Sequence, residues 1–196
     1  MKIHEIEQGT PEWLELKAGK FSASTHKDLH AKETTAAYEK AIYKIVFERL
    51  TGKSPETFKN DYMERGNELE AEARKDYELT KFVKVREVGF VELNEWVGCS
   101  PDGLIGNDGL LEIKCPSFNV MINYLLKQTL PSIYKWQVHF QMYVTGRKWV
   151  DFYAYHPDLK SVIVRVERDE IIIKEIDQKL KESITKVKQI LKQLKS

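Results

Sequence analysis

The sequence contains few cysteines, and this scarcity limits the cofactors it can hold. The chain of 196 residues has two, Cys99 and Cys115. Two cysteines are too few for an iron–sulfur cluster or a structural zinc site. In a reducing compartment we expect them to be small buried residues rather than a disulfide. The cysteines therefore point to no cofactor of their own.

The chain also lacks long apolar runs and an excess of charge of either sign. No apolar stretch reaches the length of a membrane span, and the first five residues carry no signal-peptide-like apolar run. We therefore expect a cytoplasmic protein with no membrane partner. With 31 Lys and Arg against 30 Asp and Glu, the net charge is +1. Any affinity for nucleic acid must then come from local patches.

What is present is the composition of an ordinary globular protein. Hydrophobic residues make up 42% of the chain and charged residues 31%. A chain of this length can bury a sizeable core, so we expect one domain over residues 1–196. Its last part, about residues 169–195, has the pattern of one amphipathic helix, which we expect to pack on the sheet of that domain. A short coiled coil is the alternative.

The stretch from Cys99 to Pro116 reads CSPDGLIGNDGLLEIKCP and predicts a β-turn-β unit. A turn at Pro101 to Gly103 follows a short strand that ends at Ser100. The glycine-rich segment Gly106 to Gly109 then reverses the chain into a second strand, Leu110 to Cys115. Such a reversal can place the carboxylate of an acid in the first arm next to one in the second.

Two acids and one lysine occupy these arms. Asp102 lies ten positions before Glu112. Because side chains of a strand alternate between faces, Glu112 and Lys114 share the face opposite to the apolar residues of that strand. Two carboxylates placed close together repel each other unless a cation binds them, and Mg²⁺ prefers a few carboxylate oxygens together with water and phosphate.

This arrangement indicates metal-dependent hydrolysis of phosphodiesters. A lysine two residues from a metal ligand can position the attacking water or help to deprotonate it, and can stabilise charge on the phosphate. The alternative is an edge hairpin with an ordinary turn and a surface ion pair between Glu112 and Lys114.

A candidate phosphate site lies near the start of the chain. Thr10 is a predicted N-cap for a helix that Gly19 closes, with Lys17 in its last turn. A second helix is expected to begin around Ser22 to Ser24. A helix N-terminus with the Ser24 hydroxyl and a nearby cation suits a phosphate group. The alternative is plain helix capping with a solvated lysine.

Two further polar residues lie on predicted helices. Glu70 borders the apolar face of a helix over about Asp61 to Leu79, where it either binds a metal or pairs with Arg74 at i+4. Gln137 lies on a helix over about Ser132 to Val144 and can equally be a solvated glutamine. Basic and aromatic residues interleave from Phe118 to Arg165. We expect the aromatic side chains to be core and the lysines and arginines to meet DNA.

Several of these stretches together resemble a known family. Pro-Asp, about ten residues, then Glu-x-Lys is similar to the PD-(D/E)XK nuclease signature. Further stretches, taken in order over roughly Glu7 to Arg168, resemble the phage lambda exonuclease type of viral recombinase, the YqaJ-like family. The stretches are Glu7-Gln8-Gly9-Thr10 with Trp13 and Lys17, Ser22-Ala23-Ser24, Arg65-Gly66 followed by Glu70, Ser100 to Gly103, Leu111 to Pro116, and Gln137-Val138 with Gln141.

The resemblance implies a fold and a set of site residues. The implied fold is α/β and restriction-endonuclease-like, with a central mixed, twisted sheet flanked by helices. Metal ligands would be Glu70, Asp102, Glu112 and the carbonyl of Ile113, with Mg²⁺ as the cofactor and Mn²⁺ able to substitute. The catalytic set would be Asp102, Glu112, Lys114 and Gln137, and Lys17 and Ser24 would contact the DNA backbone or a terminal phosphate. Relatives often have arginine where this chain has Lys17, and lysine lacks the bidentate fork.

The resemblance also implies an activity. The expected function is a 5′-to-3′ exonuclease on double-stranded DNA with free ends, which produces 3′ overhangs for phage-type recombination. A homotrimeric ring, an annealing protein as partner and a phage or prophage origin in a bacterial host belong to the same expectation. The alternatives are a PD-(D/E)XK endonuclease and a non-catalytic DNA-binding recombination module.

Overall fold

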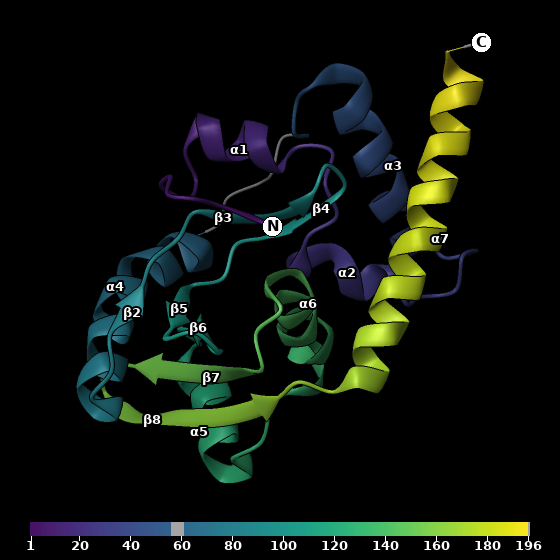
Figure 1. The fold of residues 1–196 in the computed structure, drawn as a ribbon. Coiled ribbons are helices and arrows are strands. Elements are labelled where there is room, and N and C mark those ends of the chain that lie inside the picture. The colour runs from purple at the N-terminus through teal and green to yellow at the C-terminus, as the bar shows by residue number, and fades with distance from the viewer. Residues whose placement is uncertain (56–60, 196) are drawn as a thin grey trace.

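A five-stranded mixed sheet forms the centre of the computed structural model (Figure 1), which describes residues 1–55 and 61–195, with side chains omitted for 61–68. The strand order is β2-β5-β6-β7-β8. Only the β6–β7 pairing is parallel. The predicted α/β fold with a mixed central sheet flanked by helices is confirmed. The strands are β2 (Val85–Arg86), β5 (Gly103–Ile105), β6 (Gly109–Lys114), β7 (Trp149–His156) and β8 (Leu159–Glu167).

Helices cover both faces of this sheet. Successive side chains of β6 point to opposite faces, and the apolar ones on each face pack against helices. Leu111 and Ile113 pack with Ala73 and Tyr77 of α4 (Asp61–Lys81), so α4 covers one face. On the opposite face Leu110 packs with residues of α6. Because β6 and β7 are parallel, the chain needs a crossover connection between them, and this connection consists of the helical segments on that side. These segments are α5 (Phe118–Lys127), the 3₁₀ turn η1 (Ser132–Tyr134) and α6 (Lys135–Thr145).

A second, three-stranded sheet in the order β1-β3-β4 was not predicted. Its strands are β1 (Lys2–His4), β3 (Phe90–Asn94) and β4 (Val97–Cys99). Strands β2 and β3, which lie on either side of Gly89, belong to different sheets. The chain changes sheets at Gly89, where a Cβ would lie 2.0 Å from the carbonyl oxygen of Ile6.

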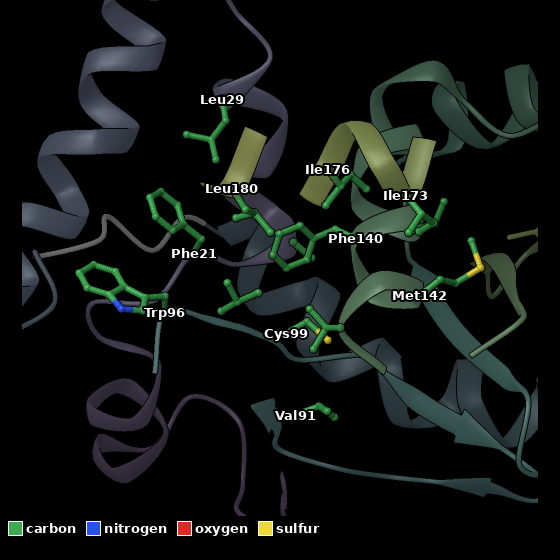
Figure 2. Packing of buried hydrophobic residues seen from close by; sticks show 14 of the residues in the cluster. Phe21, Leu29, Val91, Trp96, Cys99, Phe140, Met142, Ile173, Ile176 and Leu180 are labelled. Atoms are coloured by element: carbon green, nitrogen blue, oxygen red, sulfur yellow. The ribbon is translucent and has the colours of Figure 1, made fainter. Parts of the chain in front are cut away.

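The remaining helices pack around a large apolar core on one side of the molecule. Figure 2 shows Phe21, Phe140, Ile176 and Leu180 meeting there. The C-terminal helix packs mainly against α3 and α6 rather than on the sheet, which corrects the sequence expectation. The bounds are α1 (Pro11–Lys17), α2 (Ala23–Leu29), α3 (Ala36–Thr51) and α7 (Glu170–Leu194). In the described part of the chain, none of the helices has an apolar stretch that could traverse a bilayer.

Some basic residues that we expected to meet DNA serve the fold instead. Arg165 forms two hydrogen bonds of 2.8 and 2.9 Å with the buried carboxylate of Asp151 and stacks on Trp149. Arg147 donates through Nη1 to the carbonyls of three residues in the β5–β6 turn, at 2.7 to 3.2 Å. Those carbonyls belong to Ile105, Gly106 and Gly109. The aromatic residues of this section are largely buried, as expected.

Candidate active site

The β5–β6 hairpin brings Asp102 beside Glu112. The backbone N–H of Ile113 donates to Asp102 Oδ2 at 2.6 Å. Gly103, which follows Asp102, pairs with Leu111 and lies so near Val85 that a Cβ would be 2.1 Å from Val85 Cγ1. Burial, and then the charge of Glu112, raise the pKa of Asp102 well above its usual value. The two acids are thus close enough to repel each other.

Glu112 is buried and held by hydrogen-bond donors. Its side chain is 1% exposed. Gln137 Nε2 donates to Oε1 at 2.5 Å, and Gln141 Nε2 donates to Oε2 at 2.6 Å. Lys114 Nζ also donates to Oε1. Because a buried carboxylate is costly without such partners, these contacts stabilise the side chain of Glu112 and fix its orientation.

Lys114 donates hydrogen bonds to two groups that the family resemblance implies to be metal ligands. Besides Glu112 Oε1, its Nζ donates to the carbonyl of Ile113 at 3.0 Å. Burial disfavours the charged amine, but Glu112 and Asp102 outweigh this effect and raise the pKa of Lys114 above its usual value. Lys114 is therefore an ammonium ion at neutral pH in this arrangement, and it cannot accept a proton from water there.

Glu70 lies near these groups but has another partner. Arg74 Nη2 donates to Glu70 Oε1 at 2.6 Å, which is the i+4 pair considered from the sequence. Arg74 also pairs with Glu87 and donates through Nε to the carbonyl of Asp102 at 3.3 Å. Burial is the main cause that raises the pKa of Glu70, with a smaller contribution from Glu112. Arg65 and Gly66 of the quoted motif lie outside the described side chains.

The donor set fits a hard divalent cation. Carboxylate oxygens and a backbone carbonyl are the ligands that Mg²⁺ prefers. The raised pKa of Asp102 reflects burial together with the neighbouring carboxylates of Glu112 and Glu70, whose repulsion a cation would relieve. Within residues 1–55 and 69–195, no three His, Cys, Asp or Glu side chains meet at metal-binding spacing. In this structure the positively charged group that contacts the Glu112 carboxylate is the ammonium group of Lys114.

Lys17 and Ser24 line one cleft with two of the acids, Glu70 and Asp102. The cleft has a volume of about 1190 Å³, and its lining includes Lys17, Ser24, Glu70 and Asp102. Lys17 lies over the ring of Trp13, and burial followed by the charge of Lys44 lowers its pKa to about 8. Ser24 is in the first turn of α2, while Ser22 is the N-cap and makes no side-chain capping bond. Lys17 and Ser24, the candidate phosphate contacts, therefore face the same space as Glu70 and Asp102.

Further residues position the site and received no role from the sequence. Trp13 Nε1 donates to Ser100 Oγ at 2.9 Å and to the carbonyl of Gly89 at 3.0 Å. Gln8 Nε2 donates to the carbonyl of Pro101 at 3.3 Å. These contacts anchor the chain directly before Asp102. Gln8, Trp13 and Gln141 all belong to the stretches that carry the family resemblance, so the signal was present, but spacing alone did not reveal what they bind.

The sequence and structure were compared with known proteins. The model of the YqaJ-like viral recombinase domain matches residues 12–148. An alkaline exonuclease from Laribacter hongkongensis is 33% identical with a TM-score of 0.88, covering 95% of this chain and 96% of that chain, and the same enzyme has been solved in complex with dAMP. A phage related exonuclease from Haemophilus somnus 129PT shares the fold, at 16% identity and a TM-score of 0.70 over 89% of this chain and 96% of that chain. No curated protein matches the sequence.

These likenesses extend over the hairpin, the cleft and the supporting helix. The matched region contains Lys17, Ser24, Asp102, Glu112 and Gln137. They support a nuclease role in phage-type recombination. On its sequence and its fold, this chain belongs to the YqaJ-like viral recombinase family.

Proposed function

We propose that this protein is a Mg²⁺-dependent exonuclease that degrades double-stranded DNA from 5′ ends and leaves 3′ single-stranded overhangs for recombination. The observation that carries the proposal is the gathering of Asp102, Glu112 and Lys114 on one hairpin, with Gln137 bound to Glu112. The 33% identity to an alkaline exonuclease supports the same class of reaction.

The proposed metal ligands are Asp102, Glu112, Glu70 and the carbonyl of Ile113. When bound, Mg²⁺ or Mn²⁺ would stabilise charge on the phosphate and make a bound water more acidic. With a cation held by the Glu112 carboxylate, the Lys114 ammonium group would no longer be needed as its partner. As an ammonium ion it then positions the attacking water and stabilises negative charge on the phosphate. Gln137 and Gln141 keep the Glu112 carboxylate oriented throughout.

The cleft supplies the proposed DNA contacts. Lys17 and Ser24 would bind the DNA backbone or a terminal phosphate, since both face the cleft that Asp102 also lines. A homotrimeric ring around DNA, with a single-strand annealing protein as partner, completes the proposal. A ring suits a chain whose net charge is only +1. Light scattering tests the ring, and a monomeric mass at working concentration would exclude it.

The decisive experiment is digestion of linear duplexes that are labelled separately at each end. With Mg²⁺ we expect early release of the 5′ label as small products, while the 3′ label stays on long single strands. Chelation should stop the reaction, and Mn²⁺ should restore it. Early release of the 3′ label would contradict the polarity. A covalently closed plasmid should remain intact, because internal cutting would make the enzyme an endonuclease.

The variant Glu112→Gln tests the chemistry itself. It keeps the shape of the side chain but removes its charge, and we expect about a 10³-fold loss of nucleotide release with DNA binding largely retained. Glu175→Gln, the same change at an exposed position of α7, is the matched control and should leave the rate unchanged. Wild-type rates in Glu112→Gln would refute the mechanism. A wild-type protein that binds DNA but releases no nucleotide would indicate a non-catalytic module.

A further inference from the structure

The outer face of α3 exposes two aromatic side chains. Tyr43 is 53% exposed and Phe47 is 44% exposed. They are four residues apart on the helix, so their side chains are neighbours on one face. The buried side of the same helix is formed by other residues, including Tyr38 and Ile42. Neither side chain belongs to the buried apolar core of the described residues, and exposed apolar side chains that adjoin one another are common at binding surfaces.

Two lysines alternate with these aromatic residues and connect them to the cleft. Lys40 lies three residues before Tyr43, and Lys44 lies three residues before Phe47. Lys44 lines the cleft that contains Lys17 and Asp102. We call the set Lys40, Tyr43, Lys44 and Phe47 the α3 strip. It runs from the wall of the cleft onto the outer surface of the helix.

Two acids lie next to the strip: Glu39 is exposed, whereas Glu48 is buried and pairs with Lys44. Glu48 is 4% exposed, and its carboxylate accepts from the backbone N–H of Gly19 at 2.8 Å and from Ser54 Oγ at 3.1 Å. Its distance to Lys44 Nζ is 3.8 Å, so the lysine is held near the cleft without a close hydrogen bond. The strip therefore presents two aromatic rings and the Lys40 ammonium group to the solvent, with the ion-paired Lys44 at the wall of the cleft.

We propose that the α3 strip is a stacking platform for unpaired nucleotides next to the cleft. This inference rests on the proposed nuclease function. The proposed reaction removes one strand of a duplex, so unpaired nucleotides arise next to the cleft. Bases that lose their stacking neighbours can stack on Tyr43 and Phe47, while Lys40 and Lys44 contact phosphates. Alternating aromatic and basic residues are the usual means of holding a single strand without reading its sequence.

The test measures binding without cleavage. Wild-type protein in the absence of divalent metal, and Glu112→Gln as a second background, are titrated with a labelled 12-nucleotide oligothymidylate and with a blunt duplex of the same length. The double variant Tyr43→Leu with Phe47→Leu keeps apolar bulk but removes the rings. We expect its affinity for the single strand to fall about tenfold or more, with a much smaller effect on the duplex.

Two matched variants separate stacking from a general apolar contact. Phe82, at the end of α4, is 93% exposed, and Phe82→Leu should leave single-strand affinity unchanged. Tyr43→Phe with Phe47→Tyr keeps both rings and should bind like wild type. A 2-aminopurine base near the 5′ end of the strand should be quenched by wild type and less by the leucine variant.

Unchanged single-strand affinity in the leucine variant would overturn the proposal. A drop in oligomeric mass in that variant, with affinity intact, would assign the patch to a contact between protein chains and would overturn it as well. Failure of the nuclease proposal has a different signature, namely no nucleotide release from wild type with Mg²⁺, and it does not affect these binding measurements.

Discussion

Gln141 donates through Nε2 to Glu112 Oε2 at 2.6 Å, and both side chains lie in the interior, at 0% and 1% exposure. One turn earlier on α6, Gln137 donates to the other oxygen of the same carboxylate. The orientation of Glu112 is therefore set by α6 as well as by its own strand. Any change on this helix that shifts the two amides also shifts the acid.

Removal of the buried amide should affect both stability and turnover. Gln141→Leu leaves Glu112 Oε2 without its donor, and we expect the free energy of unfolding to fall by about 1–3 kcal/mol together with a lower rate of nucleotide release. Gln137→Leu should lower the rate with a smaller loss of stability, because Gln137 is only half-buried. Urea denaturation and nucleotide release measure the two effects. A Gln141→Leu protein with wild-type stability and turnover would contradict the assignment.

The lowered pKa of Lys17 predicts that recognition of DNA ends depends on pH. Burial and then Lys44 lower the pKa of Lys17 to about 8 from 10.5, so the side chain is charged at pH 7 and mostly neutral at pH 9. A preference for 5′-phosphorylated over 5′-hydroxyl ends should therefore decline between these values. Lys17→Arg should keep the preference at pH 9, because arginine stays protonated. Lys17→Met should lack it at both pH values, and an equal preference in all three proteins would exclude Lys17 from the phosphate site.

The buried acid of β7 should be a stability residue with no part in catalysis. Asp151 accepts from Tyr77 Oη at 2.6 Å and from Arg165, whose side chain is 45% exposed. Asp151→Ala leaves these donors unpaired, and we expect a loss of about 2–3 kcal/mol in unfolding free energy. Asp151→Asn keeps an acceptor and should cost less. Asp158→Asn, at an exposed position, is the control and should lie within about 0.5 kcal/mol of wild type.

Two histidines predict acid sensitivity. His26 Nε2 and His30 Nε2 are 2.9 Å apart, and His30 stacks on Trp136. Burial lowers both pKa values from 6.5, to about 3 for His26 and to about 4 for His30. As pH falls, both histidines are protonated in the unfolded chain before they are protonated in the folded protein. Their contribution to the free energy of unfolding is therefore fully present above pH 6.5 and is lost as pH falls toward 4 and 3. For the fully buried His26 alone, acidification from pH 7 to 5 should cost about 2 kcal/mol.

The variant His26→Gln measures this contribution. Glutamine can keep a hydrogen bond to His30 but does not titrate. The difference in unfolding free energy between pH 7 and pH 5 should therefore be smaller in the variant than in wild type. An identical difference in the two proteins would show that the acid sensitivity arises elsewhere.

The reversal at Gly106 to Gly109 and the strand after it could be predicted from the sequence because their signals are local. The first arm was predicted wrongly, since it is β5 (Gly103–Ile105), and the strand that ends before Ser100 is β4 of the other sheet. The glycines at the turn, the alternation along β6 and the ten-residue spacing from Asp102 to Glu112 are all set by neighbouring residues. The N-cap role of Thr10 is equally local, and its hydroxyl accepts the expected bond from the backbone N–H of Trp13.

Contacts between distant segments could not be predicted in the same way. Nothing near Gln141 in the sequence distinguishes a donor to Glu112 from a solvated glutamine. The partition of β2 and β3 between two sheets depends on the close approach of Gly89 to Ile6, which are 83 positions apart in the numbering. The apolar stripe of α7 indicates that one face is buried, but it does not specify helices rather than strands as the packing partner.

The parallel pairing of β6 with β7 has a consequence for biosynthesis. Glu112 is translated before α6, which carries its amide donors, and before the strand that lies beside it. Arg147, which donates to backbone carbonyls of the turn between Asp102 and Glu112, is also translated later. A ribosome-bound chain that ends before these segments therefore lacks the donors that hold Glu112 and the turn, so the proposed site is complete only when the last third of the polypeptide has folded onto the first part.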